Sequence, residues 1–416
     1  MIHLINKQDC CGCNSCVQCC PKSCITMRED EEGFLYPYVD ESTCVNCGLC
    51  EKVCPVISQE KERKPISVYA AKNKNDEIRK QSSSGGVFTV LAEEIIKEGG
   101  VVFGARFDEK WKVVHDYTET IEGLSVFRGS KYVQSRMEDN FKKIQYFLKK
   151  GRKVLFSGTP CQIAGLKCFL HKEYDNLLTV DFICHGVPSP GVWREYLSEE
   201  IARQCDGKNT VLSHPNDKNR DVNIESISFR DKRLGWKKFS FALTLSVSDR
   251  HGEKNSVLLS EPLNKNIFMR GFLADLYLRP SCYACPAKCF KSGSDITIGD
   301  FWGIERVMPE IDDDKGMSVV MMNTEKGIAC FQKIDVDCYL TKYEHVLRYN
   351  SAIERSVSSI IKREYFYSEK GSTLTKRVEK LTRLEYKQQF RVTLSRLFGK
   401  RVKHFIKIHI LSNFKS

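Results

Sequence analysis

The chain has 416 residues, of which 41% are hydrophobic and 28% are charged, and its formal net charge is +12. This length indicates two or three domains, and the lack of any run of about 20 apolar residues argues against a membrane-spanning helix. Residues 1–60 carry four basic and nine acidic side chains and residues 361–416 carry fifteen basic and four acidic ones, so the rest is close to neutral, which argues against a general nucleic-acid-binding protein.

Cysteine is the unusual component, because 20 are present and eleven of them lie in the first 54 residues. Eight follow the spacing C-x2-C-x2-C-x3-C-P twice, ending in Pro21 and in Pro55. Bacterial two-cluster ferredoxins hold [4Fe–4S] clusters with this run, and the fourth cysteine of each run binds the other cluster. The spacing therefore assigns one cluster to Cys10, Cys13, Cys16 and Cys54, and the other to Cys44, Cys47, Cys50 and Cys20.

Two other roles for these cysteines are less compatible with the pattern. Zinc sites use C-x2-C pairs rather than two runs of four with a trailing proline. A disulfide framework requires an oxidising compartment, and residues 1–10 lack the basic region and apolar core of a signal peptide. We therefore expect the protein in the cytoplasm. Cys11, Cys19 and Cys24 fall outside the pattern and are expected to pack near the clusters.

The first domain is expected over residues 1–60. Residues 25–40 alternate moderately and turn at Gly33, as a short hairpin would. Residues 58–65, SQEKERKP, are polar and closed by a proline, which is typical of a linker.

A strand at 68–71 opens the second domain, and a Ser/Gly run, Ser82 to Gly86, then precedes a helical pattern that ends at Gly99 and Gly100. Free N–H groups and hydroxyls at the positive end of a helix form an anion site. The alternative is a flexible loop with a helix cap. A strand at 101–105 follows, so β-α-β units have begun.

The next two units each place a cysteine at the end of a strand. After a helix at 141–150, KVLFSGTPCQIAGLKCFL predicts strand, loop and helix, with Thr159 as N-cap and Pro160 at the first helical position. Cys161 then lies in the first turn, where the dipole lowers a thiol pKa; the alternative is a small buried residue. Cys184 and His185 follow the strand at 177–182, so Cys161 and Cys184 should face one crevice, and a lone histidine is more often structural.

Strands are expected from residue 224 and over 235–250, then a helix over 268–279 and a triplet, Cys282, Cys285 and Cys289. Three cysteines need a fourth ligand, which Cys161 or Cys184 could supply. A third [4Fe–4S] cluster is the favoured interpretation, with zinc as the alternative. The triplet has the spacing C-x2-C-x3-C, whereas radical-SAM enzymes use the reverse order, C-x3-C-x2-C, which argues against a radical-SAM cluster. Residues 294–303 then deliver Asp300 and Trp302 nearby.

Seven stretches of residues 1–345 together resemble the family of coenzyme F420 hydrogenase/dehydrogenase β-subunits, which includes plant 7-hydroxymethyl chlorophyll reductases. They are SSSGGVFT, RGSKYVQS, SGTPCQIAGLK, ICHGVPSP, SFRDKRLGWK, RPSCYACPAKC and SDITIGDFWG. The resemblance implies an FAD-containing oxidoreductase fed by iron–sulfur clusters and exchanging hydride with a small-molecule substrate, coenzyme F420 being one candidate.

The resemblance also implies roles for particular residues. Ser83, Ser84, Gly85 and Gly86 would hold the flavin phosphates, and Ser130 and Lys131 would line the flavin or substrate site. Gly158, Thr159 and Pro160 would shape the loop that bears Cys161. The electron donor would be a soluble ferredoxin or a hydrogenase-like partner.

The expected fold is an α+β ferredoxin-like two-cluster module (1–60), an α/β flavin-binding domain with a mixed sheet (61–345) and a basic helical tail (346–416). Apolar residues recur at helical spacing in the tail: Leu374, Val378, Leu381, Leu394, Leu397, Phe398 and Phe405. Such a helix could lie on an anionic surface, such as the inner face of the membrane, or bind an acidic partner protein. The alternative is that it packs on its own domain.

Three functions are consistent with these features. The first is a flavin- and cluster-dependent oxidoreductase, which the Ser/Gly anion site and the cysteine-bearing crevice favour. The second is a non-catalytic subunit that relays electrons to a partner enzyme. The third is a zinc-stapled interaction protein, which would lack iron–sulfur absorption.

Overall fold

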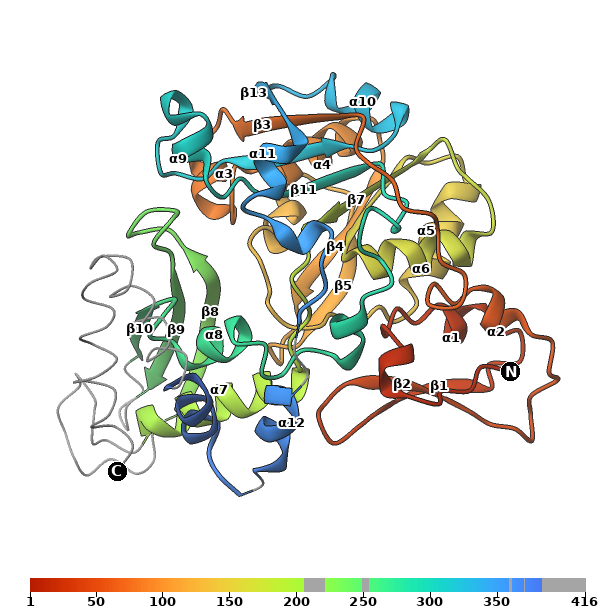
Figure 1. The fold of residues 1–416 in the computed structure, drawn as a ribbon, viewed down its shortest axis with the longest axis horizontal. Coiled ribbons are helices and arrows are strands. Elements are labelled where there is room, and N and C mark those ends of the chain that lie inside the picture. Colours follow the sequence, from red (N-terminus) through yellow and green to blue (C-terminus); the bar gives the residue numbers. More distant parts are fainter. Residues whose placement is uncertain (206–220, 249–253, 359–360, 370, 384–416) are drawn as a thin grey trace, which may run out of the picture.

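The computed structural model describes residues 1–205, 221–248, 254–358, 361–369 and 371–383. Figure 1 shows three parts, which we call the cysteine module, the sheet domain and the side lobe. The cysteine module (residues 1–57, red) lies against one side of the large central sheet. The side lobe (residues 190–205, 221–248, 254–273, 361–369 and 371–383) lies toward another. The sheet domain comprises residues 67–182 and 296–353.

The cysteine module is built around one hairpin. Strands β1 (Ile25–Glu29) and β2 (Leu35–Val39) pair antiparallel. Gly33 in the turn has a φ of 89°, a conformation that glycine adopts without strain. The hairpin expected within residues 25–40 is therefore confirmed. Three short helices complete the module: η1 (Lys7–Asp9), α1 (Ser15–Cys19) and α2 (Leu49–Lys52).

The sheet domain contains one mixed sheet of eight strands in the order β13-β3-β12-β11-β7-β6-β4-β5. In chain order these are β3 (Ser67–Asn73), β4 (Val101–Phe107), β5 (Val113–Thr118), β6 (Val154–Gly158), β7 (Leu177–Phe182), β11 (Ile296–Asp300), β12 (Ser318–Met322) and β13 (Val336–Thr341). The neighbours β4, β6, β7 and β11 are parallel, and the other pairings are antiparallel. The expected mixed sheet is confirmed, and the segments that follow β6 and β7 emerge at one edge.

Helices cover both faces of this sheet. Successive strand residues point to opposite faces, so Val102 packs toward α4 (Val87–Lys97) on one face, while Val101 packs toward α5 (Asn140–Lys149) and α6 (Pro160–Leu170) on the other. The apolar periodicity of these three segments correctly predicts the helices. Helix α4 begins after Gly86 and α6 after Thr159, and both N-termini carry predicted site residues.

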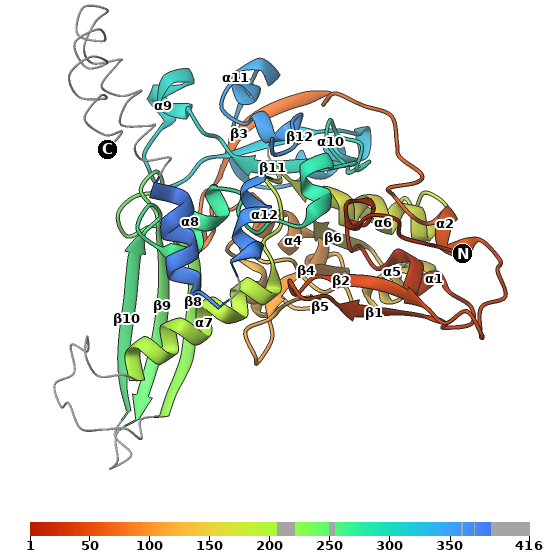
Figure 2. The ribbon, with the colours of Figure 1, turned by 60° about the horizontal axis from the view of Figure 1, so that its bottom comes forward.

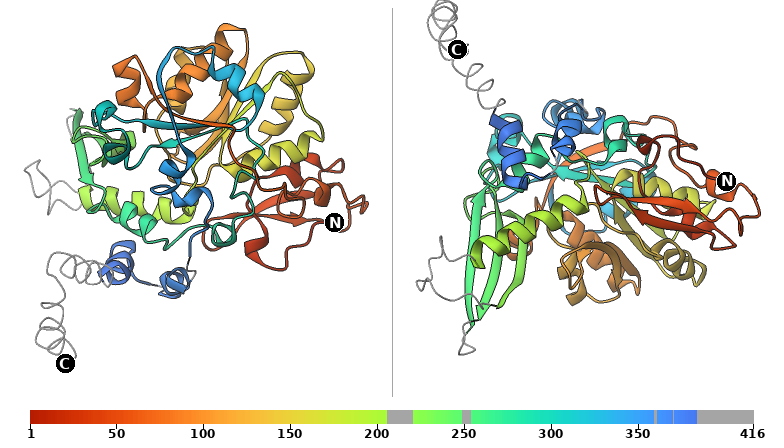
Figure 3. Two further views of the ribbon diagram at one scale, coloured as in Figure 1. Left: turned by 45° about the horizontal axis from the view of Figure 1, so that its top comes forward. Right: turned by 90° about the horizontal axis from the view of Figure 1, so that it is seen from below.

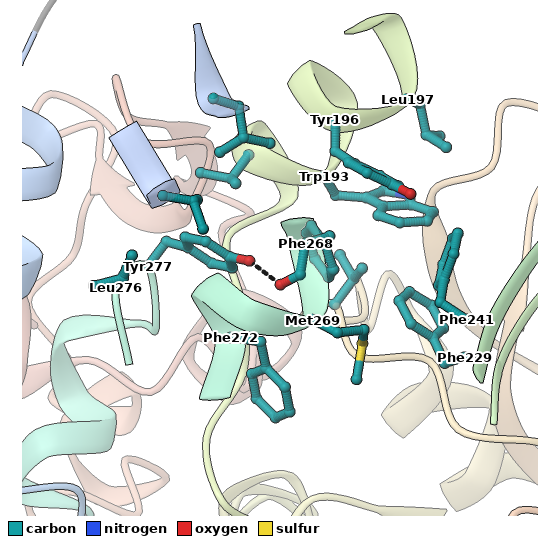
Figure 4. Packing of buried hydrophobic residues seen from close by; sticks show 14 of the residues in the cluster. Trp193, Tyr196, Leu197, Phe229, Phe241, Phe268, Met269, Phe272, Leu276 and Tyr277 are labelled. Atoms are coloured by element: carbon teal, nitrogen blue, oxygen red, sulfur yellow. Dashed lines mark hydrogen bonds between the residues drawn. The ribbon is translucent and has the colours of Figure 1, made fainter. Parts of the chain in front are cut away.

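The side lobe contains a second sheet with the order β10-β9-β8. Its antiparallel strands are β8 (Asp221–Asp231), β9 (Ser240–Ser248) and β10 (Lys254–Pro262). Figures 2 and 3 show α7 (Pro190–Cys205) packed across these strands. The buried cluster between them is aromatic: the ring of Trp193 lies 5.1 Å from those of Phe229 and Phe268 (Figure 4).

The first part of the basic tail packs on its own protein. Residues 374–383 are helical, and Leu374 and Val378 are fully buried in the aromatic cluster of the side lobe. Arg377 forms an ion pair with Glu195 of α7. The later apolar positions lie outside the described residues: Leu394, Leu397, Phe398 and Phe405.

The helix expected over 268–279 is shorter than predicted. Helix α8 spans Ile267–Leu273, and Asp275 has a left-handed φ of 59°. Residues 276–279 are all fully buried, and four consecutive buried residues do not share one face of a helix. The chain is extended there instead, and the Tyr277 carbonyl accepts a hydrogen bond from Ser189 N–H at 2.9 Å.

The remaining helices are short connections or caps. They are α3 (Asp76–Gln81), η2 (Glu122–Phe127), η3 (Pro280–Ala284), α9 (Ile304–Val307), η4 (Pro309–Ile311), α10 (Glu325–Phe331), α11 (Tyr343–Leu347), η5 (Ser351–Ile353) and α12 (Ile361–Ser368). Within the described part of the chain, every helix is too short or too polar to cross a membrane.

Candidate cofactor sites

The first cysteine group combines the leading cysteines of the first run with the last cysteine of the second. Burial raises the pKa of Cys16, and the thiols of Cys13, Cys10 and Cys54 raise it further. Burial also raises the pKa of Cys54, with a further contribution from Cys13 and Cys10. The thiols of Cys10, Cys13 and Cys54 therefore lie near enough to Cys16 to affect its pKa, and the assignment of these four cysteines to one cluster stays a prediction.

The second cysteine group lines a small cavity in the same module. Its members are Cys20, Cys44, Cys47 and Cys50, and Cys24, whose sulfur lies 3.4 Å from that of Cys20, lines the same cavity. The N–H of Ile2 donates to Cys50 Sγ at 3.2 Å, and the N–H of Asn46 donates to Cys44 Sγ at 3.4 Å. N–H donors directed at sulfur are among the features that set the potential of an iron–sulfur cluster.

We also considered whether side chains are arranged to bind a single metal ion rather than a cluster. In the described ranges, no set of three or more Cys, His, Asp or Glu side chains is arranged to hold one metal ion. The presence of iron–sulfur clusters therefore rests on the cysteine spacing and on the family comparison below.

A third cysteine group lines a cavity of about 50 Å³ at the carboxyl edge of the parallel strands. It contains Cys161 from the start of α6, Cys184 after β7, and Cys282 and Cys285. Because β6 and β7 are parallel neighbours, the segments that follow them meet at this edge. The expectation that Cys161 and Cys184 face one crevice is confirmed.

The start of α6 has the predicted local structure. Thr159 is the N-cap and forms a capping box with Gln162, and Pro160 occupies the first position. The pKa of Cys161 is lowered, as expected, but mainly because the Cys11 thiol hydrogen-bonds to it, while burial acts in the opposite direction. The Thr159 hydroxyl lies 3.2 Å from Cys161 Sγ and also favours the thiolate.

The predicted cysteine triplet is divided in the fold. Cys289 is absent from the lining of the cavity; its φ is 55°, and its sulfur lies 3.7 Å from the Glu354 carbonyl oxygen. Burial raises the pKa of Cys184 well above its ordinary value, and the nearby thiols of Cys282, Cys161 and Cys285 add to this effect. The cavity therefore combines two cysteines of the triplet, Cys282 and Cys285, with both Cys161 and Cys184. The sequence prediction had combined all three cysteines of the triplet with only one of these two.

Cys11 connects the first and third groups. It is 4% exposed and lines the same cavity as Cys161. Hydrogen bonds to the thiols of Cys13 and Cys161, with burial, hold its pKa well above the ordinary range. Cys11 therefore does more than pack near one cluster, because it contacts cysteines of two groups. The spacing of the cysteines did not predict this, because spacing describes ligands within one run and not contacts to a distant helix.

A buried carboxyl group in the same cavity has no counterpart in the sequence prediction. Asp181 on β7 is 2% exposed and accepts hydrogen bonds from Ser292 Oγ at 2.6 Å and Thr297 Oγ1 at 2.5 Å. Burial raises its pKa to about 6. The available signal was one acidic residue inside an apolar strand sequence, LLTVDF.

Half of the Ser/Gly run is engaged within the fold. The Ser84 hydroxyl donates to the Met317 carbonyl at 2.7 Å, and the Gly85 N–H donates to the Ser318 hydroxyl at 2.9 Å. A Cβ on Gly85 would overlap the carbonyl oxygen of Ala71. Ser84 and Gly85 therefore shape the loop and do not offer the free donors that the sequence predicts.

The other half of the run meets the segment around Ser130. The hydroxyl oxygens of Ser83 and Ser130 lie 2.8 Å apart, and the Ser130 N–H donates to Ser83 Oγ at 2.6 Å. Gly86 is the N-cap of α4, with a φ of 81°. The first N–H groups of this helix form a positive end suited to an anion.

Two lysines border this region. The ammonium group of Lys131 donates to the carbonyls of residues 126, 128 and 129 at 2.9, 3.0 and 3.2 Å, and burial lowers its pKa to about 7. Lys232 of the side lobe donates to the carbonyls of Ser84 and Arg79, both at 2.8 Å, and burial lowers its pKa to about 7. Lys232 was not predicted as a site residue.

The remaining predicted residues are distributed over two sites. Pro160 lines the cavity of the third cysteine group, and no hydrogen bond found within the described ranges links Gly158 or Thr159 to Ser83. Asp300, the last residue of β11, accepts two hydrogen bonds from Arg230, at 2.7 and 3.1 Å. His185 is bonded to Asp275 at 2.6 Å, which agrees with a structural histidine.

His115 on β5 makes the stability of the protein sensitive to acid. It is 4% exposed, and its Nε2 lies 3.0 Å from the carbonyl oxygen of Ser157. In the described part of the chain Nδ1 has no hydrogen-bond partner, and burial lowers the pKa of His115 to about 4 from 6.5. An imidazolium here would place a second N–H in an apolar site.

The unfolded chain binds a proton at His115 below pH 6.5, whereas the folded chain does so only near pH 4. Stability is therefore expected to fall as the pH falls through this window, by up to about 3 kcal/mol. Urea unfolding at about pH 7 and at about pH 4.5, two values that span most of this pH range, measures the loss of stability. His115→Gln should lose less stability between these values than the natural protein; equal losses would show that His115 is not responsible.

Family models match most of the described fold. The model for the C-terminal part of the beta subunit of coenzyme F420 hydrogenase/dehydrogenase matches residues 151–345, and that for the N-terminal part of the same subunit matches residues 68–141. A 4Fe-4S dicluster domain model matches residues 9–57. The first two matches contain the third cysteine group and the Ser/Gly run, and the third match contains the two cysteine runs.

Individual relatives align over part of their length. The coenzyme F420-dependent sulfite reductase of Methanocaldococcus jannaschii is 29% identical over 205 residues, which are 47% of this chain and 30% of that protein. A subunit of the F(420)H(2) dehydrogenase of Methanosarcina mazei is 23% identical over 199 residues, which are 44% of this chain and 55% of that protein. This chain therefore spans about a third to a half of these relatives.

A solved chain of the F420-reducing [NiFe] hydrogenase complex from Methanosarcina barkeri covers 79% of this chain and 94% of its own length, with 16% identity and a TM-score of 0.41. The family models for the N-terminal and C-terminal parts of the same subunit match in that order along the chain, after the dicluster domain. Together these matches show the family. The chain belongs to the family of coenzyme F420 hydrogenase/dehydrogenase β-subunits and carries an N-terminal 4Fe-4S dicluster domain.

Proposed function

We propose that this chain is an iron–sulfur flavoprotein oxidoreductase. Electrons pass from two N-terminal clusters through a third cluster to FAD, and on to a small-molecule hydride acceptor, for which coenzyme F420 is the first candidate. The observation that carries this proposal is the convergence of cysteines from three distant segments on one cavity beside the first cysteine group.

The third cluster is assigned to Cys161, Cys184, Cys282 and Cys285. Four thiols are the ligand set of a [4Fe–4S] cluster, and these four line one cavity. The set differs from the sequence expectation, in which Cys289 took part and either Cys161 or Cys184 was sufficient. A zinc ion held by the same thiols is the alternative.

The order of the clusters follows from the contacts of Cys11. The first cluster is assigned to Cys10, Cys13, Cys16 and Cys54, and the second to Cys20, Cys44, Cys47 and Cys50. Cys11 hydrogen-bonds to a proposed ligand of the first cluster, Cys13, and to one of the third, Cys161. The first cluster is therefore next to the third, and the second is the entry point from an external donor such as a soluble ferredoxin.

The proposed flavin site combines the start of α4 with the Ser83–Ser130 pair. The N-terminal N–H groups of α4 and the two hydroxyls suit the phosphates. Lys131 and Lys232 lie nearby, and burial lowers the pKa of each to about 7; a bound phosphate would favour their protonated forms. When bound, FAD converts single electrons from the clusters into hydride exchange. The chain's own contribution is a loop held in place by Ser84 and Gly85, with two half-buried lysines beside it.

A non-catalytic relay subunit is the second candidate. The observation that favours it is the partial coverage of the curated relatives, since this chain aligns to 30% of the F420-dependent sulfite reductase. In such an assembly a partner enzyme would carry out the chemistry, and this chain would deliver electrons to it.

Iron and flavin content of anaerobically purified protein tests these functions. The proposal expects about 12 iron atoms, from three [4Fe–4S] clusters, and one FAD per chain. About 8 iron atoms without flavin, which corresponds to two clusters, would favour the relay subunit. Zinc in place of iron would contradict both.

A further inference from the structure

Arg279 is a fully buried cation that touches the first cysteine run. Its exposed fraction is 0%, and it stands three residues before Cys282 in the extended segment after α8. Its Nε donates to the carbonyl oxygen of Cys10 at 2.7 Å, and one terminal nitrogen lies 3.5 Å from Cys10 Sγ. The same guanidinium donates to Gln134 Oε1 and to the Leu35 carbonyl, both at 2.9 Å.

This arginine differs from the other buried arginines of the described chain. The other four are each paired with a carboxylate: Arg79 with Asp313, Arg230 with Asp300, Arg363 with Glu32 and Arg377 with Glu195. Within the described ranges no Asp or Glu forms an ion pair with Arg279. A buried charge without an opposite charge is strongly unfavourable, so a negative group is required beside it.

The first cluster is the negative group that this position can accommodate. Cys10 is one of its four proposed ligands, and a cubane held by thiolates carries negative charge whose size contributes to the reduction potential. The ring of Tyr36 lies 4.3 Å from the guanidinium carbon and that of Phe34 5.4 Å away. These rings exclude water from the guanidinium, and a low-dielectric environment strengthens its interaction with the cluster.

The second cluster has a different environment. Two positive groups belong to residues that line its cavity, the side chain of Lys22 and the amino group of Met1, and both residues are exposed to solvent. Water and salt screen an exposed charge, so its effect on a cluster is small. The two proposed N-terminal clusters therefore have similar ligands but unequal electrostatic surroundings.

We infer that Arg279 is the counter-ion of the first cluster and holds its reduction potential above that of the second. One electron then moves from the second cluster, which is oxidised, to the first, which is reduced, and the charge of Arg279 favours this direction. Arg279 is a positioning residue, because it also ties the Cys10 loop to the segment that bears Cys282. The inference rests on the cluster assignment proposed above.

The test is a redox titration followed by electron paramagnetic resonance, with iron content measured on the same samples. Arg279→Met and Arg279→Gln remove the charge, and Arg279→Lys retains it. The neutral variants are expected to disfavour reduction of the first cluster by at least about tenfold, which is about 59 mV for a one-electron couple. Arg279→Lys should shift it by less than half as much.

Lys22→Met is the matched control, because it removes one positive charge beside the second cluster and should leave all potentials unchanged. Unchanged potentials in iron-complete neutral variants would overturn the inference, as would equal shifts in all three Arg279 variants. Loss of iron from the neutral variants alone would support it, and loss from Arg279→Lys as well would overturn it. Absence of iron from the natural protein would instead reject the cluster assignment.

Discussion

Cys282→Ser is expected to remove about four iron atoms per chain, whereas Cys289→Ser is expected to leave the iron content unchanged. Cys282 lines the cavity shared with Cys161, Cys184 and Cys285. The sulfur of Cys289 instead lies 3.7 Å from the Glu354 carbonyl oxygen. Soft thiolates are the preferred ligands of iron–sulfur clusters, and a serine oxygen is a poor substitute.

These two variants distinguish the ligand set taken from the cavity, which excludes Cys289, from the set expected from the sequence spacing, which includes it. Iron analysis and visible absorption of anaerobically purified protein provide the measurement. Cys161→Ser and Cys184→Ser should each behave like Cys282→Ser, because the two N-terminal clusters are expected to remain. The assignment fails if Cys289→Ser loses about four iron atoms or if either upstream variant retains all of its iron.

Arg230→Met is expected to destabilise the protein by about 3–5 kcal/mol, because it leaves the carboxylate of Asp300 buried without its partner. The side chains of Arg230 and Asp300 are 3% and 17% exposed, and two hydrogen bonds join them. The pair connects β8 of the side lobe with β11 of the sheet domain. Trp236 Nε1 also donates to Asp300, at 3.0 Å.

Urea unfolding of the single and double variants measures this interaction. Arg230→Met combined with Asp300→Asn should cost less than the sum of the two single changes, since the second change removes the unpaired charge. Arg233→Ala is the matched control: its partner is Asp231 and its side chain is 45% exposed, so a loss below about 1 kcal/mol is expected. Additive single effects would contradict a buried ion pair.

The cysteine runs illustrate what local sequence predicts well. Three ligands at fixed spacing wrap one cluster through the covalent geometry of a short segment, whereas the crossed placement of Cys54 and Cys20 is expected from the ferredoxin pattern of the two runs. The N-cap at Thr159 and the position of Cys161 in the first turn of α6 are equally local. Such features depend on a few consecutive residues, so the sequence alone predicts them.

The third cysteine group illustrates what local sequence does not predict. The triplet spacing favoured Cys289, but two consecutive residues with positive φ, Cys289 and Phe290, turn the chain there. The role of Cys11 depends on a contact with α6, which is distant in the chain. The carboxylate partners of the other buried arginines are also distant in sequence, so no local pattern distinguishes Arg279 from them.

The amino-acid sequence by itself determined the two cysteine runs, the alternating strands and helices, the start of α6 and the family resemblance, because periodicity, capping and ligand spacing act over a few residues. The tertiary structure decided which cysteines share the third cavity, which donors of the Ser/Gly run remain free and which buried arginine lacks a carboxylate. Those outcomes depend on the strand order β11-β7-β6-β4 and on how the cysteine module docks, and both are set by the packing of residues far apart in the chain.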